Sequence, residues 1–218
     1  MNATSHPMTT LVKICGLTRD EDVATAIECG AGFLGFIVDA PSKRRLSVSA
    51  AAALALSAKG IVPRVAVTVN ADDDLLSRIM AEMTPDYIQC HGDEAPERVA
   101  EIAARYGVKT IKACAVADDN DMKTAETFVG AADLILFDAK PPKGSDVRGG
   151  HGVMIDWAII KRAPLPKLYA LAGGLTPDNV ADAVNQTRAP IVDVSSGVEA
   201  SPGVKDAAKI RAFIQAVT

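Results

Sequence analysis

Short apolar runs recur along the whole chain and alternate with longer segments rich in alanine and charged residues. The apolar runs consist largely of Val, Ile, Leu and Ala and have no polar face, which is typical of parallel strands that are buried on both sides. We predict strands at residues 11–15, 33–38, 64–69, 87–90, 110–113, 134–137, 168–171 and 191–194.

The segments between these strands show the 3.6-residue periodicity of amphipathic helices. We predict one helix after each strand, at residues 21–28, 49–59, 72–83, 95–105, 121–129, 156–162, 177–186 and 206–217. Thr18 and Glu21 have the spacing of a capping box, and Thr176 before Pro177 has the pattern of an N-cap before a first helical position. Regular alternation of strands and helices predicts an α/β fold with a parallel sheet.

Eight strand–helix units favour a single (β/α)8 TIM barrel over residues 11–218, preceded by a flexible tail of residues 1–10. A doubly wound open sheet is the alternative, and it usually carries a GxGxxG turn after its first strand. The turn here is Cys15-Gly16-Leu17-Thr18, which lacks that pattern. We therefore expect a barrel, with its functional residues at the C-terminal ends of the strands.

The composition excludes several classes of protein. With 49% hydrophobic and 23% charged residues in 218 positions, the chain is typical of a globular protein. A net charge of −4 argues against nucleic acid as a partner, and no apolar run reaches the ~18 residues of a membrane span. The four cysteines form no CxxC pair, which indicates free thiols in the cytoplasm, and three histidines are too few to suggest a metal site.

Two reactive side chains stand where predicted strands end. Cys15 would act as a general base or nucleophile in its thiolate form, although a free cysteine is more often a small buried residue. Desolvation beside an apolar strand favours a neutral carboxyl group, so Asp138 would serve as a general acid unless it is an ordinary loop or cap carboxylate. Lys13 shares the strand parity of Cys15, so we expect both inside the barrel and expect Lys13 to help keep the thiol ionised.

The last two strands are followed by segments suited to phosphate. Gly173-Gly174 offers bare backbone N–H groups, and Ser195-Ser196-Gly197 adds hydroxyl groups just after Asp193. Barrels often bind phosphate with the loops after strands seven and eight, which favours a phosphate site over two ordinary turns. Arg44 would pair with a substrate carboxylate unless it is a solvated surface charge, and His91 is expected to be hydrogen-bonded at the rim.

In this order and spacing, these motifs resemble the N-(5′-phosphoribosyl)anthranilate isomerase family of tryptophan biosynthesis. The resemblance extends from Val12 to about Val217. It rests on Lys13-Ile14-Cys15-Gly16-Leu17-Thr18, Gly35-Phe36-Ile37, Ser42-Lys43-Arg44, Gln89-Cys90-His91-Gly92-Asp93, Phe137-Asp138, Asp156-Trp157, Ala172-Gly173-Gly174-Leu175-Thr176-Pro177 with Asn179, and Asp193-Val194-Ser195-Ser196-Gly197-Val198-Glu199.

The resemblance implies a phosphate-binding barrel that performs an Amadori rearrangement with no metal or organic cofactor. It implies that Cys15 is the general base, that Asp138 is the general acid and that Arg44 meets the anthranilate carboxylate. The substrate-binding set that it implies is Lys13, Arg44, His91, Gly173, Gly174, Asp193, Ser195, Ser196 and Gly197. The expected partners are a small phosphorylated substrate and, loosely, other enzymes of the tryptophan pathway.

The sequence departs from the family pattern at three places, none of them the proposed acid or base. Asp39-Ala40 replaces a frequent aromatic residue, Cys90 replaces an aliphatic one, and a GGTG segment reads Gly149-Gly150-His151-Gly152 within the irregular residues 139–153. Two alternatives stay open. A histidine-pathway isomerase on the same barrel would carry an aspartate where this chain has Cys15, and a non-catalytic binder or synthase subunit would need neither Cys15 nor Asp138.

Overall fold

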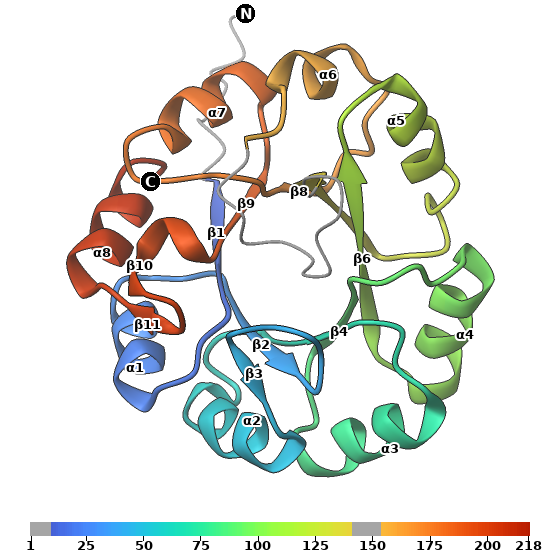
Figure 1. Ribbon diagram of the computed structural model, residues 1–218, viewed down its shortest axis with the longest axis vertical. Coiled ribbons are helices and arrows are strands. Elements are labelled where there is room, and N and C mark those ends of the chain that lie inside the picture. The colour runs from blue at the N-terminus through green and yellow to red at the C-terminus, as the bar shows by residue number, and fades with distance from the viewer. Residues whose placement is uncertain (1–9, 141–153) are drawn as a thin grey trace, which may run out of the picture.

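The computed structural model describes residues 10–140 and 154–218, and its centre is a closed ring of eight parallel strands (Figure 1). The ring consists of β1 (Leu11–Cys15), β2 (Phe33–Val38), β4 (Arg64–Thr68), β5 (Tyr87–Cys90), β6 (Lys109–Val116), β7 (Leu134–Ala139), β8 (Tyr169–Leu171) and β9 (Ile191–Val194). Strand β1 pairs with β2 on one side and with β9 on the other, which closes the ring. The predicted TIM barrel is therefore confirmed. The expected tail, apart from residue 10, and the GGTG-like segment lie outside the described residues.

Helices surround the ring on its outer side (Figure 1). They are α1 (Asp20–Glu28), α2 (Val48–Ala55), α3 (Asp73–Glu82), α4 (Pro96–Tyr106), α5 (Asp119–Glu126), α6 (Trp157–Arg162), α7 (Val180–Thr187) and α8 (Ala207–Gln215). The 3-10 helix η1 (Leu56–Ala58) directly follows α2 and lies within the helix predicted at residues 49–59. The sequence pattern predicts none of the other short elements, which are β3 (Arg45–Leu46), η2 (Ser196–Val198), β10 (Glu199–Ser201) and β11 (Val204–Lys205). Within the described ranges, no helix has both the length and the apolar character needed to cross a membrane.

Two helix starts differ from the prediction. The capping box at Thr18 is wrong, because its hydroxyl donates to the carbonyl oxygen of Gly203 and α1 begins after Arg19 without a side-chain cap. Helix α7 begins later than residue 177, because the amide oxygen of Asn179 accepts a 2.8 Å hydrogen bond from the backbone N–H of Thr176. At Thr18 a contact outside the helix takes the hydroxyl that the local pattern assigned to a cap. At α7 the residue before the helix is Asn179 instead of Thr176.

Side-chain alternation along the strands divides the core into two parts. One face of each strand packs against the helices in a large outer core. The other faces the barrel interior, whose apolar cluster consists of Cys15, Phe33, Val65, Val67, Ile111, Ala113, Leu134, Leu136, Ala170, Ala172 and Ile191. Four polar residues share this inward parity at or near the C-terminal half of their strands: Lys13, Gln89, Asp138 and Asp193. The fold thus concentrates reactive groups in an interior that is otherwise apolar.

Candidate functional site

Lys13, Cys15 and Asp193 form the first part of the site, where β1 meets β9. Lys13 and Asp193 are register partners, and the Nζ–Oδ1 distance of their ion pair is 2.7 Å. A Cβ atom at Gly35 would lie 2.9 Å from the Sγ atom of Cys15 and 3.2 Å from the Nζ atom of Lys13. The missing side chain of Gly35 therefore provides the space that the thiol and the ammonium group share, and the shared inward direction predicted for Lys13 and Cys15 is confirmed.

Burial dominates the electrostatics of this group. It raises the pKa of the Cys15 thiol; the positive charge of Lys13 opposes this shift, the negative charge of Asp193 adds to it, and Lys205 again opposes it. Burial alone would lower the pKa of Lys13, but the ion pair with Asp193 raises it above its ordinary value, so Lys13 stays charged. Lys13 thus favours the thiolate form of Cys15, as expected, although burial has the larger effect on the pKa and favours the neutral thiol.

We expect Lys13→Met to raise the pKa of the Cys15 thiol further, because the largest opposing charge is removed. Asp193→Asn is the matched control of opposite sign, since removal of the neighbouring negative charge lowers the pKa. The rate of alkylation by iodoacetamide as a function of pH measures both values in a Cys29→Ser background, where the half-buried thiol of Cys29 cannot react. Equal pKa values in the two variants would contradict this account.

Asp138 and His91 form the second part of the site. Asp138 lies near the C-terminal end of β7, and its Oδ2 atom is 3.5 Å from Nε2 of His91 in the loop after β5. The Nε2 group of Gln89 lies 2.8 Å from Nδ1 of His91. With the Gln89 amide as donor, His91 carries its proton on the nitrogen that faces Asp138. His91 is thus hydrogen-bonded as expected, and Gln89, whose inward parity was the available signal, is a site residue that sequence reasoning missed.

Arg44 is buried and engaged rather than solvated. Its Nε and Nη2 groups donate to the two carboxylate oxygens of Glu199 at 2.6 and 2.7 Å. The hydrogen bonds to Glu199 raise the pKa of Arg44. Its aliphatic stem crosses Gly16, where a Cβ atom would lie 2.5 Å from the Cδ atom of Arg44 and where φ is +73°. Its neighbours Lys43 and Arg45 are exposed.

The two predicted phosphate segments lie against each other. A Cβ atom at Gly197 in η2 would clash with the carbonyl oxygen of Leu175, so this turn packs directly on the loop after β8. A Cβ atom at Gly173 would lie 2.7 Å from the backbone nitrogen of Ala139. The loop after β8 therefore lies beside the residue that follows Asp138. The fold therefore joins the ends of β7, β8 and β9 at one rim.

Lys112 lies outside this site, near the middle of β6. Its neighbours Ile111 and Ala113 face the barrel interior, so Lys112 points outward, as Cys114 does. Its Nζ group lies 2.7 Å from a carboxylate oxygen of Glu94 and donates to the carbonyl oxygen of Gly92 at 2.7 Å. Strand parity excludes Lys112 from the group of inward residues.

The other cysteines have no place in the site. Burial raises the pKa of Cys90 to about 12 and that of Cys114 to about 11, so both are unreactive near neutral pH. All four cysteines are free thiols, as predicted. In the part of the chain that the structure describes, no group of three His, Cys, Asp or Glu side chains is arranged to hold a metal ion.

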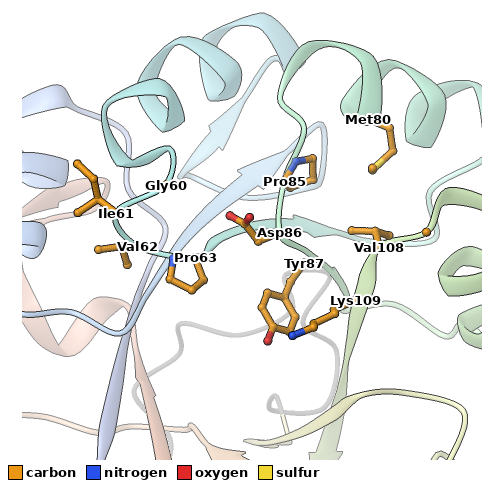
Figure 2. A pocket seen from close by; sticks show the side chains of 11 residues that line it. Gly60, Ile61, Val62, Pro63, Met80, Pro85, Asp86, Tyr87, Val108 and Lys109 are labelled. Carbon is orange, nitrogen blue, oxygen red and sulfur yellow. The ribbon is translucent and has the colours of Figure 1, made fainter.

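A cavity of about 580 Å³ lies at the other end of the barrel (Figure 2). Pro63 precedes β4, and Tyr87 and Lys109 are the first residues of β5 and β6, so the cavity borders the N-terminal ends of these strands. None of the predicted site residues lines it. In TIM barrels this end contributes mainly to stability, which leaves the C-terminal rim as the candidate active site.

Comparison with known proteins identifies the family. Residues 12–216 match the family model described as N-(5′-phosphoribosyl)anthranilate (PRA) isomerase. A protein of that name from Cereibacter sphaeroides is 48% identical over 205 residues, which cover 94% of this chain and 97% of the relative. One from Paracoccus denitrificans is 45% identical over 211 residues, covering 97% and 98%.

Solved structures give the same result. The phosphoribosyl anthranilate isomerase of Thermotoga maritima has a TM-score of 0.86 at 36% identity, covering 95% of this chain and 98% of its own. A PRA isomerase complex with reduced 1-(o-carboxyphenylamino)-1-deoxyribulose 5-phosphate has a TM-score of 0.81 at 33% identity, with the same coverage.

Proposed function

Because the chain belongs to the N-(5′-phosphoribosyl)anthranilate isomerase family and is a PRA isomerase of tryptophan biosynthesis, we propose that Cys15 and Asp138 carry out its proton transfers. The product is 1-(2-carboxyphenylamino)-1-deoxy-D-ribulose 5-phosphate. The solved relative that holds the reduced form of this compound supports the product assignment. The observation that carries the roles of Cys15 and Asp138 is their inward position at the C-terminal rim of a largely apolar barrel, the rim expected for catalysis.

The reaction needs one proton donor and one proton acceptor. Protonated Asp138 donates to the ring oxygen of the ribose, and the ring opens to a Schiff base between the first sugar carbon and the aryl nitrogen. The Cys15 thiolate then removes the proton from the adjacent carbon, which gives an enolamine that tautomerises to the ketone. Each positioned acid or base contributes typically 10²–10⁴ in rate. Because burial raises the pKa of Cys15, the thiolate fraction and the rate rise with pH on the alkaline side.

The remaining residues hold the two charged ends of the substrate. Arg44 binds the anthranilate carboxylate, and the turns at Gly173-Gly174 and Ser195-Ser196-Gly197 bind the phosphate. Gln89 is hydrogen-bonded to His91, whose Nε2 atom lies 3.5 Å from Asp138, and this arrangement supports Asp138. Lys13 favours the thiolate form of Cys15, Asp193 holds Lys13 through their ion pair, and both contact the sugar. Interactions with the remote phosphate provide binding energy that orients the reacting carbon.

The test follows the fate of the first sugar carbon. Substrate labelled with ¹³C at that carbon should lose its anomeric resonance and gain a methylene resonance as the fluorescence of the substrate falls, with the same rate in the presence of a chelator. Hydrolysis would instead leave an anomeric resonance of ribose 5-phosphate and would contradict the proposed rearrangement. The histidine-pathway aminoaldose, assayed in parallel, is expected to be a poor substrate because Cys15 stands where that chemistry needs an aspartate.

A cytoplasmic location and a loose association with other tryptophan-pathway enzymes stay predictions. The four free thiols support the first.

A further inference from the structure

Glu199 lies between two buried cations. Its carboxylate accepts both hydrogen bonds from Arg44, and its Oε1 atom lies 3.0 Å from Nζ of Lys205. The exposed fractions of the three side chains are 10% for Arg44, 6% for Glu199 and 0% for Lys205. The backbone N–H of Gly203 donates to the same oxygen at 3.2 Å, so the hairpin of β10 and β11 closes over the carboxylate. This arrangement fixes the Nε edge of the guanidinium and leaves Nη1 without a hydrogen-bond partner among the described residues.

Lys205 also reaches the predicted phosphate turn. Its Nζ atom donates to the carbonyl oxygen of Ser195 at 3.0 Å and lies 3.4 Å from the hydroxyl oxygen of Ser195. A Cβ atom at Gly16 would lie 2.9 Å from that hydroxyl and 2.5 Å from the Cδ atom of Arg44. The side chains of Ser195 and Arg44 therefore both lie against the backbone of Gly16. One buried ammonium group is therefore bonded both to the carboxylate that holds Arg44 and to the first residue of the Ser195-Ser196-Gly197 turn.

We propose that Lys205 and Glu199 are positioning residues that join the carboxylate-binding and phosphate-binding ends of the site into one unit. This inference rests on the proposed role of Arg44. Neither residue needs to touch the substrate, since Glu199 orients the guanidinium of Arg44 and Lys205 holds both Glu199 and Ser195. A change at Lys205 is thus transmitted to both ends of the substrate.

The charge of the unit fits its ligand. Two cations and one carboxylate leave an excess of one positive charge in a buried place, which a substrate anion neutralises. Burial lowers the pKa of Lys205, and the negative charge of Glu199 opposes this shift only in part. Burial acts to raise the pKa of Glu199, but the hydrogen bonds from Arg44 and the charge of Lys205 bring it below its ordinary value. The unit is therefore built to attract an anion with groups that are already ordered.

The test measures two competitive inhibitors that each represent one end of the substrate: 2-aminobenzoate for the carboxylate and ribose 5-phosphate for the phosphate. Lys205→Met is expected to raise Ki for both by roughly tenfold, the loss typical of a charged hydrogen bond, and to raise KM more than it lowers kcat. The matched control is Lys209→Met, because exposed Lys209 reaches only the backbone carbonyl of Glu199 and its loss should change neither Ki. If Lys205→Met does not fold, the double variant Glu199→Gln/Lys205→Met takes its place, because it removes both charges of the pair. It is expected to raise Ki for both inhibitors in the same way.

Weakening of only one inhibitor, or of neither, by a folded Lys205 variant would overturn the inference. Arg44→Met separates this outcome from a failure of the proposed function. Loss of 2-aminobenzoate binding in Arg44→Met but not in Lys205→Met would leave the role of Arg44 intact and remove only the coupling. Unchanged 2-aminobenzoate binding in Arg44→Met would make both wrong.

Discussion

Cys15→Ser and Asp138→Asn are each expected to lower kcat by about 10²- to 10⁴-fold, the usual contribution of a positioned base or acid. The serine hydroxyl is too weak an acid to supply an anion near neutral pH, and the asparagine amide cannot donate the proton that opens the ring. Because the two groups act in successive steps of one reaction, the double variant should lose less than the product of the two single losses. Single-turnover loss of substrate fluorescence measures all three variants.

Matched controls exist for both changes. Cys114→Ser alters a buried thiol that faces the helices, and Asp119→Asn alters an exposed carboxylate that pairs with Arg162 on the surface. Both should keep a wild-type kcat. A loss of less than tenfold in folded Cys15→Ser or Asp138→Asn would move the proton transfer to another group.

Lys112→Met is expected to destabilise the protein by about 3–5 kcal/mol, the usual cost of leaving one member of a buried ion pair alone. Lys112 and Glu94 have side chains that are each 4% exposed. Glu94 also accepts hydrogen bonds from the backbone N–H groups of Asn70 and Gly92, so its charge anchors the loop after β5. Urea unfolding measures the change in the free energy of unfolding.

Two further variants sharpen this test. Glu94→Gln/Lys112→Met removes both charges and should recover part of the lost stability, since no uncompensated charge is buried. Lys140→Met removes a cation whose side chain is 50% exposed, and its pair with Asp121 should contribute at most about 1 kcal/mol. Equal losses of stability in Lys112→Met and Lys140→Met would contradict this prediction, because they would show that a buried ion pair costs no more to break than an exposed one.

Hydrophobic periodicity was sufficient to predict the barrel, because parallel strands buried on both faces leave a strong local pattern. The predicted limits of the strands at residues 11–15, 33–38, 87–90 and 191–194 coincide with β1, β2, β5 and β9. Strand β6 is longer than predicted, since its register with β7 continues to Val116 opposite Ala139. Elements as short as β3 and β11, with two residues each, are too short to show a periodicity. They form only where a neighbouring strand pairs with them, so the local sequence does not predict them.

The sequence predicts a site residue correctly when its position at the end of a predicted strand is enough to place it at the rim. Cys15, Asp138 and Asp193 fall into this class, because each stands near the end of an apolar run. Glu199 and Lys205 required the structure, since the partner of Glu199 is Arg44, 155 positions earlier in the chain. The same limit explains the wrong capping box, where the hydroxyl of Thr18 is bound to Gly203.

The ion pair of Lys13 and Asp193 joins residues that are 180 positions apart, near the two ends of the barrel sequence. During synthesis, the N-terminal strand emerges long before its partner exists, so the ammonium group of Lys13 has no carboxylate to meet until the last strand is made. Contacts of such high sequence separation are slow to form. Ring closure is therefore the step in which the surroundings of the thiol are completed, and the reactivity of Cys15 during refolding reports the arrival of β9 rather than the early collapse of the chain.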